Sequence, residues 1–223
     1  MFRIAGIALI LSVASLTGAS AYATRDGDVR FPGVGPQVRS ITFGSKTGVP
    51  MGYFDLCKSH KSFCRMTRRA DQIDGRLRLT KRKADQVMAV NAQANRGIRS
   101  ISDQANHGVV DRWSISPRAG DCEDYALTKK KRLMALGWPS SALLVALATT
   151  RRGEPHAVLI VRTDSGDLVL DNLRSEIRAW SPSLYRWESV QSPTQMWTWH
   201  RFGRGEITPV FVKKSTGRQL VRQ

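Results

Sequence analysis

The stretch GDCEDYALTKKKRLMALGW, residues 120–138, has the pattern of a helix with both ends marked. Asp121 is of a residue type that favours the N-cap position, and acidic side chains follow it in the first turn. Four basic residues stand in the C-terminal half, and Gly137, followed closely by a proline, ends the pattern. The stretch therefore predicts a helix over residues 121–136, with Cys122 at its N-terminus.

Three apolar runs with the length of β-strands follow this helix. They cover residues 142–148, 156–161 and 168–170, and the segments RRGEP and TDSGD between them are typical of hairpin turns. Because the runs are almost continuously apolar, we expect strands that are covered on both faces. Apolar residues at helical spacing predict a further helix over residues 79–104. The fold class is therefore α+β, with the helix at 121–136 packed on an antiparallel sheet.

Three residues of this region have the chemistry of a cysteine nucleophile site. Cys122 opens a helix, where the positive end of the macrodipole favours a thiolate. His156 opens a strand and could hold the ion pair and protonate a leaving amine, and Asp171 ends the next strand and could fix the imidazole tautomer. If Asp171 does not reach the imidazole, Asn172 or another polar group would orient it.

The strand register sets a condition on this arrangement. If Ser165-Gly166 forms the tip of a tight hairpin, the ladder pairs Asp171 with Ile160, which is four residues from His156. Four residues correspond to roughly 13 Å along a strand, which is too far for a hydrogen bond. We therefore expect a bulge, or a turn centred earlier, near residues 162–164.

The local sequence words resemble one family. GDCEDYALTKKKRLMALGW, EPHAVLIVRT and GDLVLDNL closely resemble the bacterial transglutaminase-like cysteine proteinases, a family that includes periplasmic proteases which trim surface adhesins and so release biofilms. The resemblance covers at least residues 113–180. It implies a papain-like or transglutaminase-like core, with Cys122 as nucleophile, His156 as base and Asp171 as orienting acid. The implied activity is cleavage of a protein substrate.

Acidic residues flank the candidate nucleophile, although carboxylates beside a thiolate would raise its pKa. Some adhesin-cleaving members of the family bind calcium through such residues, and Asp121 and Glu123 match those positions. Calcium takes six to eight oxygen ligands, so further ligands would be needed. The alternative is that Asp121 caps the helix while Glu123 and Asp124 act as favourable first-turn charges. The thiol chemistry itself needs no cofactor, and calcium is the one metal that the resemblance suggests.

The N-terminus has the pattern of a secretory signal peptide over residues 1–23. A basic residue precedes a short apolar run, and Ala21-Tyr22-Ala23 fits the small-x-small cleavage pattern. The expected organisation continues with a loop-rich lead-in over 24–78, the peptidase domain over 79–200 and a basic tail over 201–223. No other segment is apolar and long enough to cross a membrane, so we expect a periplasmic or secreted protein.

The exported chain would carry three cysteines in an oxidising compartment, and an odd number indicates one pair and one free thiol. Cys57 and Cys64 are separated by six residues, which can form a loop that lets the two sulfurs meet. The expected disulfide is therefore Cys57–Cys64, with Cys122 free. The alternative is that all three are reduced and buried.

The chain has 35 Lys and Arg against 18 Asp and Glu, a formal net charge of +17. This charge predicts anionic surroundings, such as lipopolysaccharide, acidic polysaccharide or another anionic envelope component, or an acidic protein substrate. Nucleic acid is not expected, because the chain is predicted to be exported and has no nucleic-acid-binding signature.

Two other functions remain compatible with the sequence. An acyl-enzyme on Cys122 could pass its acyl group to a lysine amine rather than to water, which would make the protein a crosslinking transamidase. Alternatively, the protein could be a basic envelope-binding module with a vestigial triad. The family resemblance and the predicted export favour hydrolysis.

Overall fold

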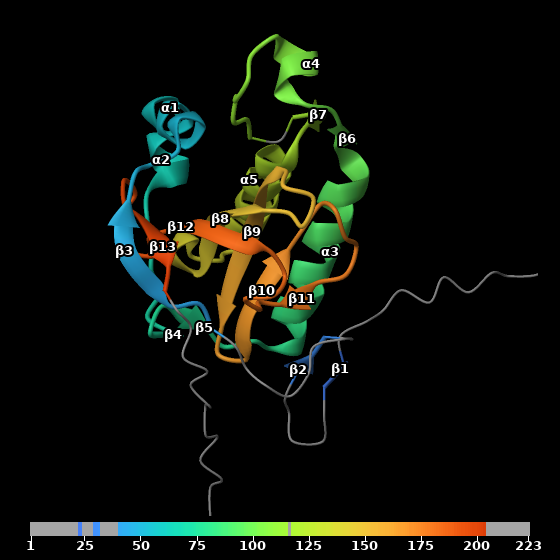
Figure 1. Cartoon of the computed structure of the whole chain (residues 1–223). Helices are drawn as coiled ribbons and strands as arrows, with labels where there is room; N and C mark the ends of the chain where they lie inside the picture. Colours follow the sequence, from blue (N-terminus) through green and yellow to red (C-terminus); the bar gives the residue numbers. More distant parts are fainter. Residues whose placement is uncertain (1–21, 24–28, 32–39, 116, 204–223) are drawn as a thin grey trace, which may run out of the picture.

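Strands β8 (Leu143–Thr149), β9 (Pro155–Thr163) and β10 (Gly166–Leu170) form the antiparallel centre of the sheet (Figure 1). They are seen in a computed structural model, which describes residues 22–23, 29–31, 40–115 and 117–203. The three strands predicted from the apolar runs are confirmed, with ends shifted by one or two residues. They are buried almost throughout, as expected for strands covered on both faces.

Further strands extend this ladder in the order β11-β10-β9-β8-β12-β13-β3, and every neighbouring pair is antiparallel. The additional strands are β3 (Phe43–Thr47), β11 (Arg178–Ala179), β12 (Arg186–Gln191) and β13 (Trp199–Phe202). Two-residue strands complete the set: β1 (Tyr22–Ala23), β2 (Val29–Arg30), β4 (Gln72–Ile73), β5 (Arg76–Leu77), β6 (Arg99–Ser100) and β7 (Ala119–Gly120). Of these, β5 pairs with β9 and β6 with β7, both in parallel.

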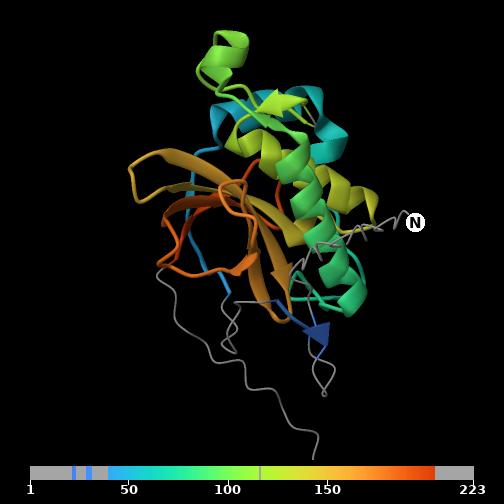
Figure 2. The same cartoon turned by 90° about the vertical axis from the view of Figure 1, so that its right-hand side faces the viewer.

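The helices are α1 (Met51–Ser59), α2 (Lys61–Cys64), α3 (Lys81–Gly97), α4 (Asp103–His107) and α5 (Cys122–Ala135), with a 3₁₀ turn at Ser140–Ala142. Figure 2 shows α3 and α5 side by side on one face of a curled sheet. The predicted helix at 121–136 is confirmed, and the α+β class, with the helix that carries Cys122 packed on an antiparallel sheet, is observed.

The helix predicted over residues 79–104 is shorter than expected. Thr80 caps α3 by accepting a hydrogen bond from the Lys83 N–H, and the helix ends at Gly97. Ile98 then takes an extended conformation, and the chain enters β6 before the short helix α4. Glycine has a low helix propensity, which explains why the helix stops although the apolar spacing continues to Ile101.

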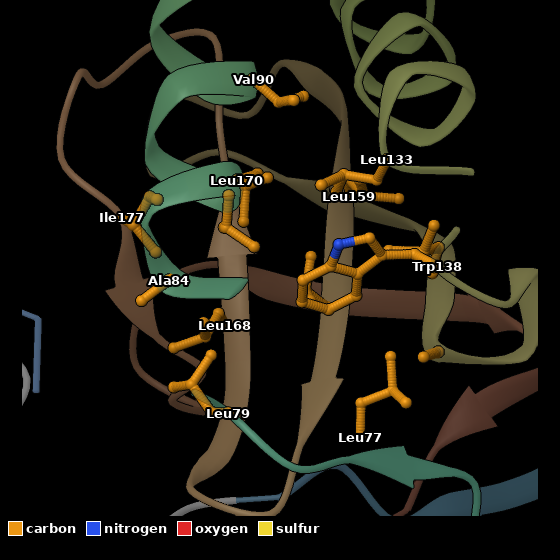
Figure 3. Packing of buried hydrophobic residues seen from close by; sticks show 14 of the residues in the cluster. Leu77, Leu79, Ala84, Val90, Leu133, Trp138, Leu159, Leu168, Leu170 and Ile177 are labelled. Carbon is orange, nitrogen blue, oxygen red and sulfur yellow. The ribbon is translucent and has the colours of Figure 1, made fainter. Parts of the chain in front are cut away.

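The main core lies between the two helices and the sheet (Figure 3). Val90 of α3 and Leu133 of α5 point toward Leu159 of β9 and Leu170 of β10, and all four side chains are buried. Truncation of such a leucine to alanine costs about 2–5 kcal/mol, because it loses burial and leaves a cavity. This core fixes the position of α5 against β9, on which the candidate site depends.

The opposite face of the sheet is covered by aromatic side chains from the C-terminal part of the chain. Trp180 stacks on Phe202 at 6.2 Å between ring centroids, and Trp187 lies 4.9 Å from the same ring. This agrees with the interpretation that the tryptophan-rich segment packs against the sheet.

The segment expected to be a loop-rich lead-in, residues 24–78, contains several regular elements in its described part. Strand β3 belongs to the main sheet, and a disulfide links Cys57 of α1 to Cys64 of α2. At the other end, β13 extends into the expected tail at 201–223, of which residues 204–223 lie outside the described part. Most of the predicted signal peptide, residues 1–21, also lies outside it. Among the described helices, none has the length and apolar character of a membrane span.

Candidate active site

Cys122 is the first residue of α5, and its thiol is the free cysteine of the chain. Asp121 occupies the N-cap position, but its side chain makes no capping hydrogen bond. Asp121 Oδ2 instead accepts a hydrogen bond from the backbone N–H of Asp103, at 3.1 Å. Asp121 is therefore the N-cap residue, as expected, but its side chain does not cap the helix, and its carboxylate faces a second acidic residue.

His156 and Asp171 are brought together by the β9–β10 hairpin. The ladder pairs Gly166 with Thr163, so the turn is centred one residue earlier than a Ser165-Gly166 tip would place it. The pairing runs without a bulge, and His156 Nε2 lies 2.9 Å from Asp171 Oδ1. Both side chains are buried. The expectation of a turn centred earlier in the sequence is confirmed, and the alternative expectation, a bulge, is not observed.

Tyr185 is a member of this site that the sequence did not reveal. Its hydroxyl donates a hydrogen bond to Asp171 Oδ2, and its ring packs edge-on against His156 at 5.3 Å between centroids. The backbone N–H of Leu173 donates to Asp171 Oδ1 at 2.9 Å. Tyr185 stands in a segment rich in aromatic residues, where nothing in the local sequence separates a hydrogen-bonding tyrosine from one that only packs.

These contacts set the charge state of Asp171. Burial by itself would raise the pKa of the carboxyl, but the hydrogen bonds from His156 and Tyr185 outweigh it, and the pKa lies below its ordinary value. A carboxylate that stays ionised can hold the imidazole in one tautomer and stabilise an imidazolium. With Nε2 bound to Asp171, Nδ1 is the ring nitrogen left to face a thiol.

The thiol of Cys122 lies near the beginning of β9, close to the backbone N–H of Ala157, the residue after His156. Burial raises the pKa of the thiol, and the Glu123 carboxylate, 3.4 Å from the sulfur, raises it further. The expected thiolate is therefore not favoured by these neighbours alone, since their effect outweighs that of the helix N-terminus.

An acidic cluster surrounds the start of α5. Carboxylate oxygens of Asp103, Asp121 and Asp124 lie within 4.8 Å of one another, and so do those of Asp103, Asp111 and Glu123. One oxygen each of Asp103, Asp121 and Asp124 is buried without a hydrogen-bond partner in the described part of the chain. The sequence pointed to Asp121 and Glu123, whereas Asp103 is the first residue of α4 and Asp111 lies in the loop that follows that helix.

The cluster is electrostatically unbalanced. The pKa of Asp124 is raised to about 7 and that of Glu123 to about 10, mainly by burial and in part by the neighbouring Asp121. Burial likewise raises the pKa of Asp103. Several carboxylate oxygens therefore point toward one another, and some of them have no hydrogen-bond donor in the described part of the chain. Such a group suits a cation such as calcium, which binds oxygen ligands in flexible geometry.

Three solved structures of Legionella pneumophila LapG are similar to this chain. The calcium-bound form is 29% identical, with a TM-score of 0.46 over 55% of this chain and 71% of that one. The EGTA-treated form is 26% identical, with a TM-score of 0.43 over 53% of this chain and 70% of that one. A further LapG structure gives 28% identity and a TM-score of 0.43, over 52% and 67% of the two chains. A search of curated protein sequences finds no match.

A sequence profile described as bacterial transglutaminase-like cysteine proteinase BTLCP matches residues 43–206, which is well over half of the chain. The match begins at β3 and includes Cys122, His156 and Asp171. The chain therefore belongs to the bacterial transglutaminase-like cysteine proteinase family.

Proposed function

We propose that this protein is an exported cysteine peptidase that cleaves a protein substrate through Cys122, His156 and Asp171. The observation that carries the proposal is the buried His156–Asp171 hydrogen bond, next to Ala157, whose backbone N–H lies close to the Cys122 thiol. The thiol of Cys122 at the start of α5, the imidazole of His156 in β9 and the carboxylate of Asp171 after β10 would then supply the nucleophile, the base and the orienting acid that acyl transfer requires. The family itself supports the peptidase class.

In the proposed reaction, Nδ1 of His156 takes the proton of the Cys122 thiol, and the sulfur attacks the carbonyl carbon of the scissile peptide bond. The backbone N–H of Cys122 has no acceptor within its helix and would stabilise the oxyanion. The imidazolium then gives its proton to the leaving amine as the C–N bond breaks. Water, deprotonated by the same imidazole, hydrolyses the thioester and restores the thiol.

We propose that the acidic cluster binds calcium. Asp103, Asp121 and Asp124 would hold the ion, and Glu123, which lies in the second group with Asp103, would also contribute. The fit rests on their convergent oxygens, three of which have no hydrogen-bond partner in the described part of the chain. When bound, the ion would supply positive charge that offsets these carboxylates. Glu123 would then raise the pKa of the thiol less, and the helix N-terminus and His156 would favour the thiolate more effectively.

Export is proposed from the signal pattern at residues 1–23, and the Cys57–Cys64 disulfide supports it, because such bonds persist in oxidising compartments. The net charge of +17 supports an anionic partner at the cell surface. A protein of the cell surface, in the context of a biofilm, is the substrate class that we propose on these grounds.

The experiment that tests the proposal measures the rate of iodoacetamide labelling of Cys122 against pH, with calcium and with EGTA, by mass spectrometry. We expect labelling well below the pH of about 8.5 at which a free thiol ionises, a shift to higher pH in His156→Ala, and slower labelling in EGTA. Labelling like that of an ordinary thiol in both conditions would contradict the peptidase proposal and favour a binding module. Incubation of the acylated enzyme with an amine would distinguish a transamidase from a hydrolase.

A further inference from the structure

A groove of about 560 Å³ lies beside the candidate active site. One wall is the turn between β8 and β9, and the other comes from the segments on either side of β11. The volume falls in the range of about 300–1,000 Å³ that is typical of ligand sites. The groove is therefore large enough to hold several residues of an extended peptide.

Four arginines line this groove: Arg151, Arg152, Arg174 and Arg178. Glu154 is the acidic residue among its lining side chains. Within the described part of the chain, none of the four guanidinium groups forms an ion pair. Like charges that gather without counter-ions repel one another, and an anionic ligand relieves this repulsion. Arginine also binds carboxylates through two parallel hydrogen bonds.

The groove adjoins the candidate active site at Tyr185. This side chain lines the groove, and its hydroxyl donates to Asp171, the hydrogen-bond partner of His156. Arg174 lies close enough to Tyr185 to interact with its hydroxyl electrostatically, which links the arginine group to the same network. A ligand that contacts Tyr185 in the groove would therefore lie one side chain away from Asp171.

The groove also offers apolar contacts. The side chain of Leu173, which follows the site by two residues, is 58% exposed and lines it. Mixed apolar and cationic walls suit a polypeptide that carries both aliphatic and acidic side chains better than a uniformly charged polysaccharide.

We infer that this groove binds an acidic segment of the protein substrate and so selects where the chain is cut. The inference rests on the proposed peptidase function. Arg151 and Arg152 act as specificity-determining residues, because they line the groove without contacting the His156–Asp171 pair. Arg174 is coupled to Tyr185 and is therefore left out of the test variants.

The first measurement is binding to the protein with Cys122→Ala, followed by fluorescence anisotropy. The probes are fluorescein-labelled octapeptides rich in Glu or in Gln, and a labelled heparin fragment. The double variant R151Q/R152Q should bind the Glu-rich peptide about tenfold more weakly. The control R68Q/R82Q removes the same charge from two exposed arginines outside the groove and should stay within about twofold.

Equal losses in both double variants would overturn the inference, because they would show that net charge alone attracts the peptide. A heparin fragment that binds more tightly than the Glu-rich peptide, with the same dependence on Arg151 and Arg152, would also overturn it and assign the groove to anionic polysaccharide.

The second measurement exposes a mixture of proteome-derived peptides to the enzyme with intact Cys122 and identifies the new termini by mass spectrometry. We expect Asp and Glu to be enriched near the cut, and this enrichment to fall in R151Q/R152Q but not in R68Q/R82Q. Cleavage that shows no such enrichment would overturn the inference and leave the peptidase proposal intact. If Cys122-dependent cleavage is absent altogether, the peptidase proposal fails, and the assignment of the groove to substrate fails with it.

Discussion

His156 reaches Asp171 diagonally across two neighbouring strands, with Nε2 2.9 Å from Oδ1. The ladder ends at the pair Leu170–Leu159, so a continued register would place Asp171 opposite Val158, two residues from His156. Diagonal neighbours on one face of a sheet are within reach of long side chains. The imidazole is therefore held by the sheet itself, which resists reorientation better than a surface loop.

The first prediction concerns the charge of Asp171. In Asp171→Asn the amide keeps the shape of the carboxylate but cannot stabilise an imidazolium, so kcat/KM for peptide cleavage should fall by a factor on the order of 10²–10⁴. Asp55→Asn, which removes an exposed carboxylate of α1, is the matched control and should leave the rate unchanged. Equal rates in Asp171→Asn and the parent enzyme would remove Asp171 from the proposed triad.

The second prediction concerns Tyr185, which we regard as a positioning residue. Tyr185→Phe removes the hydroxyl that donates to Asp171 and so raises the pKa of that carboxyl. Protonation of Asp171 would then begin at higher pH, so the acid limb of the kcat profile should move upward, with a loss in kcat of about tenfold. The measurement is a pH–rate profile.

Tyr125→Phe is the control for this variant, because it removes the tyrosine hydroxyl that donates to the Ile98 carbonyl at 2.6 Å. It should lower the stability of the fold without moving the profile. If Tyr185→Phe also leaves the profile in place and only destabilises the protein, the hydroxyl is structural rather than positioning.

The fold was largely predictable where its signals are local. Helix α5 has acidic residues in its first turn, basic residues in its C-terminal half and a glycine just after its end, and strands β8 to β10 are almost continuous apolar runs. By contrast, β3 pairs with β13, more than 150 residues away, and nothing local to the lead-in indicates that pairing. The burial of Lys129 and Lys130 was also not foreseen, since a run of lysines is usually a solvated face.

The candidate site shows the same division. Cys122, His156 and Asp171 stand at the ends of regular elements, and a strand meander that joins them is readable from the sequence. Tyr185 and Asp103 reach the site from distant segments, 14 residues after Asp171 and 18 before Asp121. Their roles depend on tertiary packing, because tyrosine and aspartate each occur often at positions where they bind nothing.

The third prediction concerns the acidic cluster. The pKa of Asp124 is raised to about 7 and that of Asp103 is also raised, so in EGTA their folded forms bind protons more tightly than the unfolded chain does. Their contribution to stability is then present at about pH 4 and is lost as the pH rises toward 7. Calcium should reverse this loss at pH 7 and add about 2.7 kcal/mol at a concentration one hundred times its Kd.

Thermal unfolding with calcium or EGTA at pH 5 and pH 7 measures this effect. Asp124→Asn should flatten the pH dependence in EGTA and abolish the gain from calcium. Asp85→Asn, which breaks an exposed ion pair of α3 with Lys81, should behave like the parent protein. A calcium effect that survives in Asp124→Asn would place the ion elsewhere.

The fourth prediction concerns Lys129, whose amine is fully buried without a hydrogen-bond partner in the described part of the chain. Burial lowers its pKa to about 7, whereas the unfolded chain keeps an ordinary lysine near 10.4. Between pH 7 and about 10.4 the Lys129 amine is protonated in the unfolded chain but not in the folded protein. The free energy of unfolding should therefore rise with pH, by up to about 1.4 kcal/mol per pH unit for this residue. Lys129→Met should remove the contribution of Lys129 to this slope and stabilise the protein at pH 7, while buried Lys130, whose pKa is also lowered to about 7, keeps its own contribution. Urea denaturation at pH 7, 8 and 9 would show this. Lys131→Met, at an exposed neighbour on α5, should keep the slope, and parallel curves for the two variants would mean that Lys129 is charged in the folded protein.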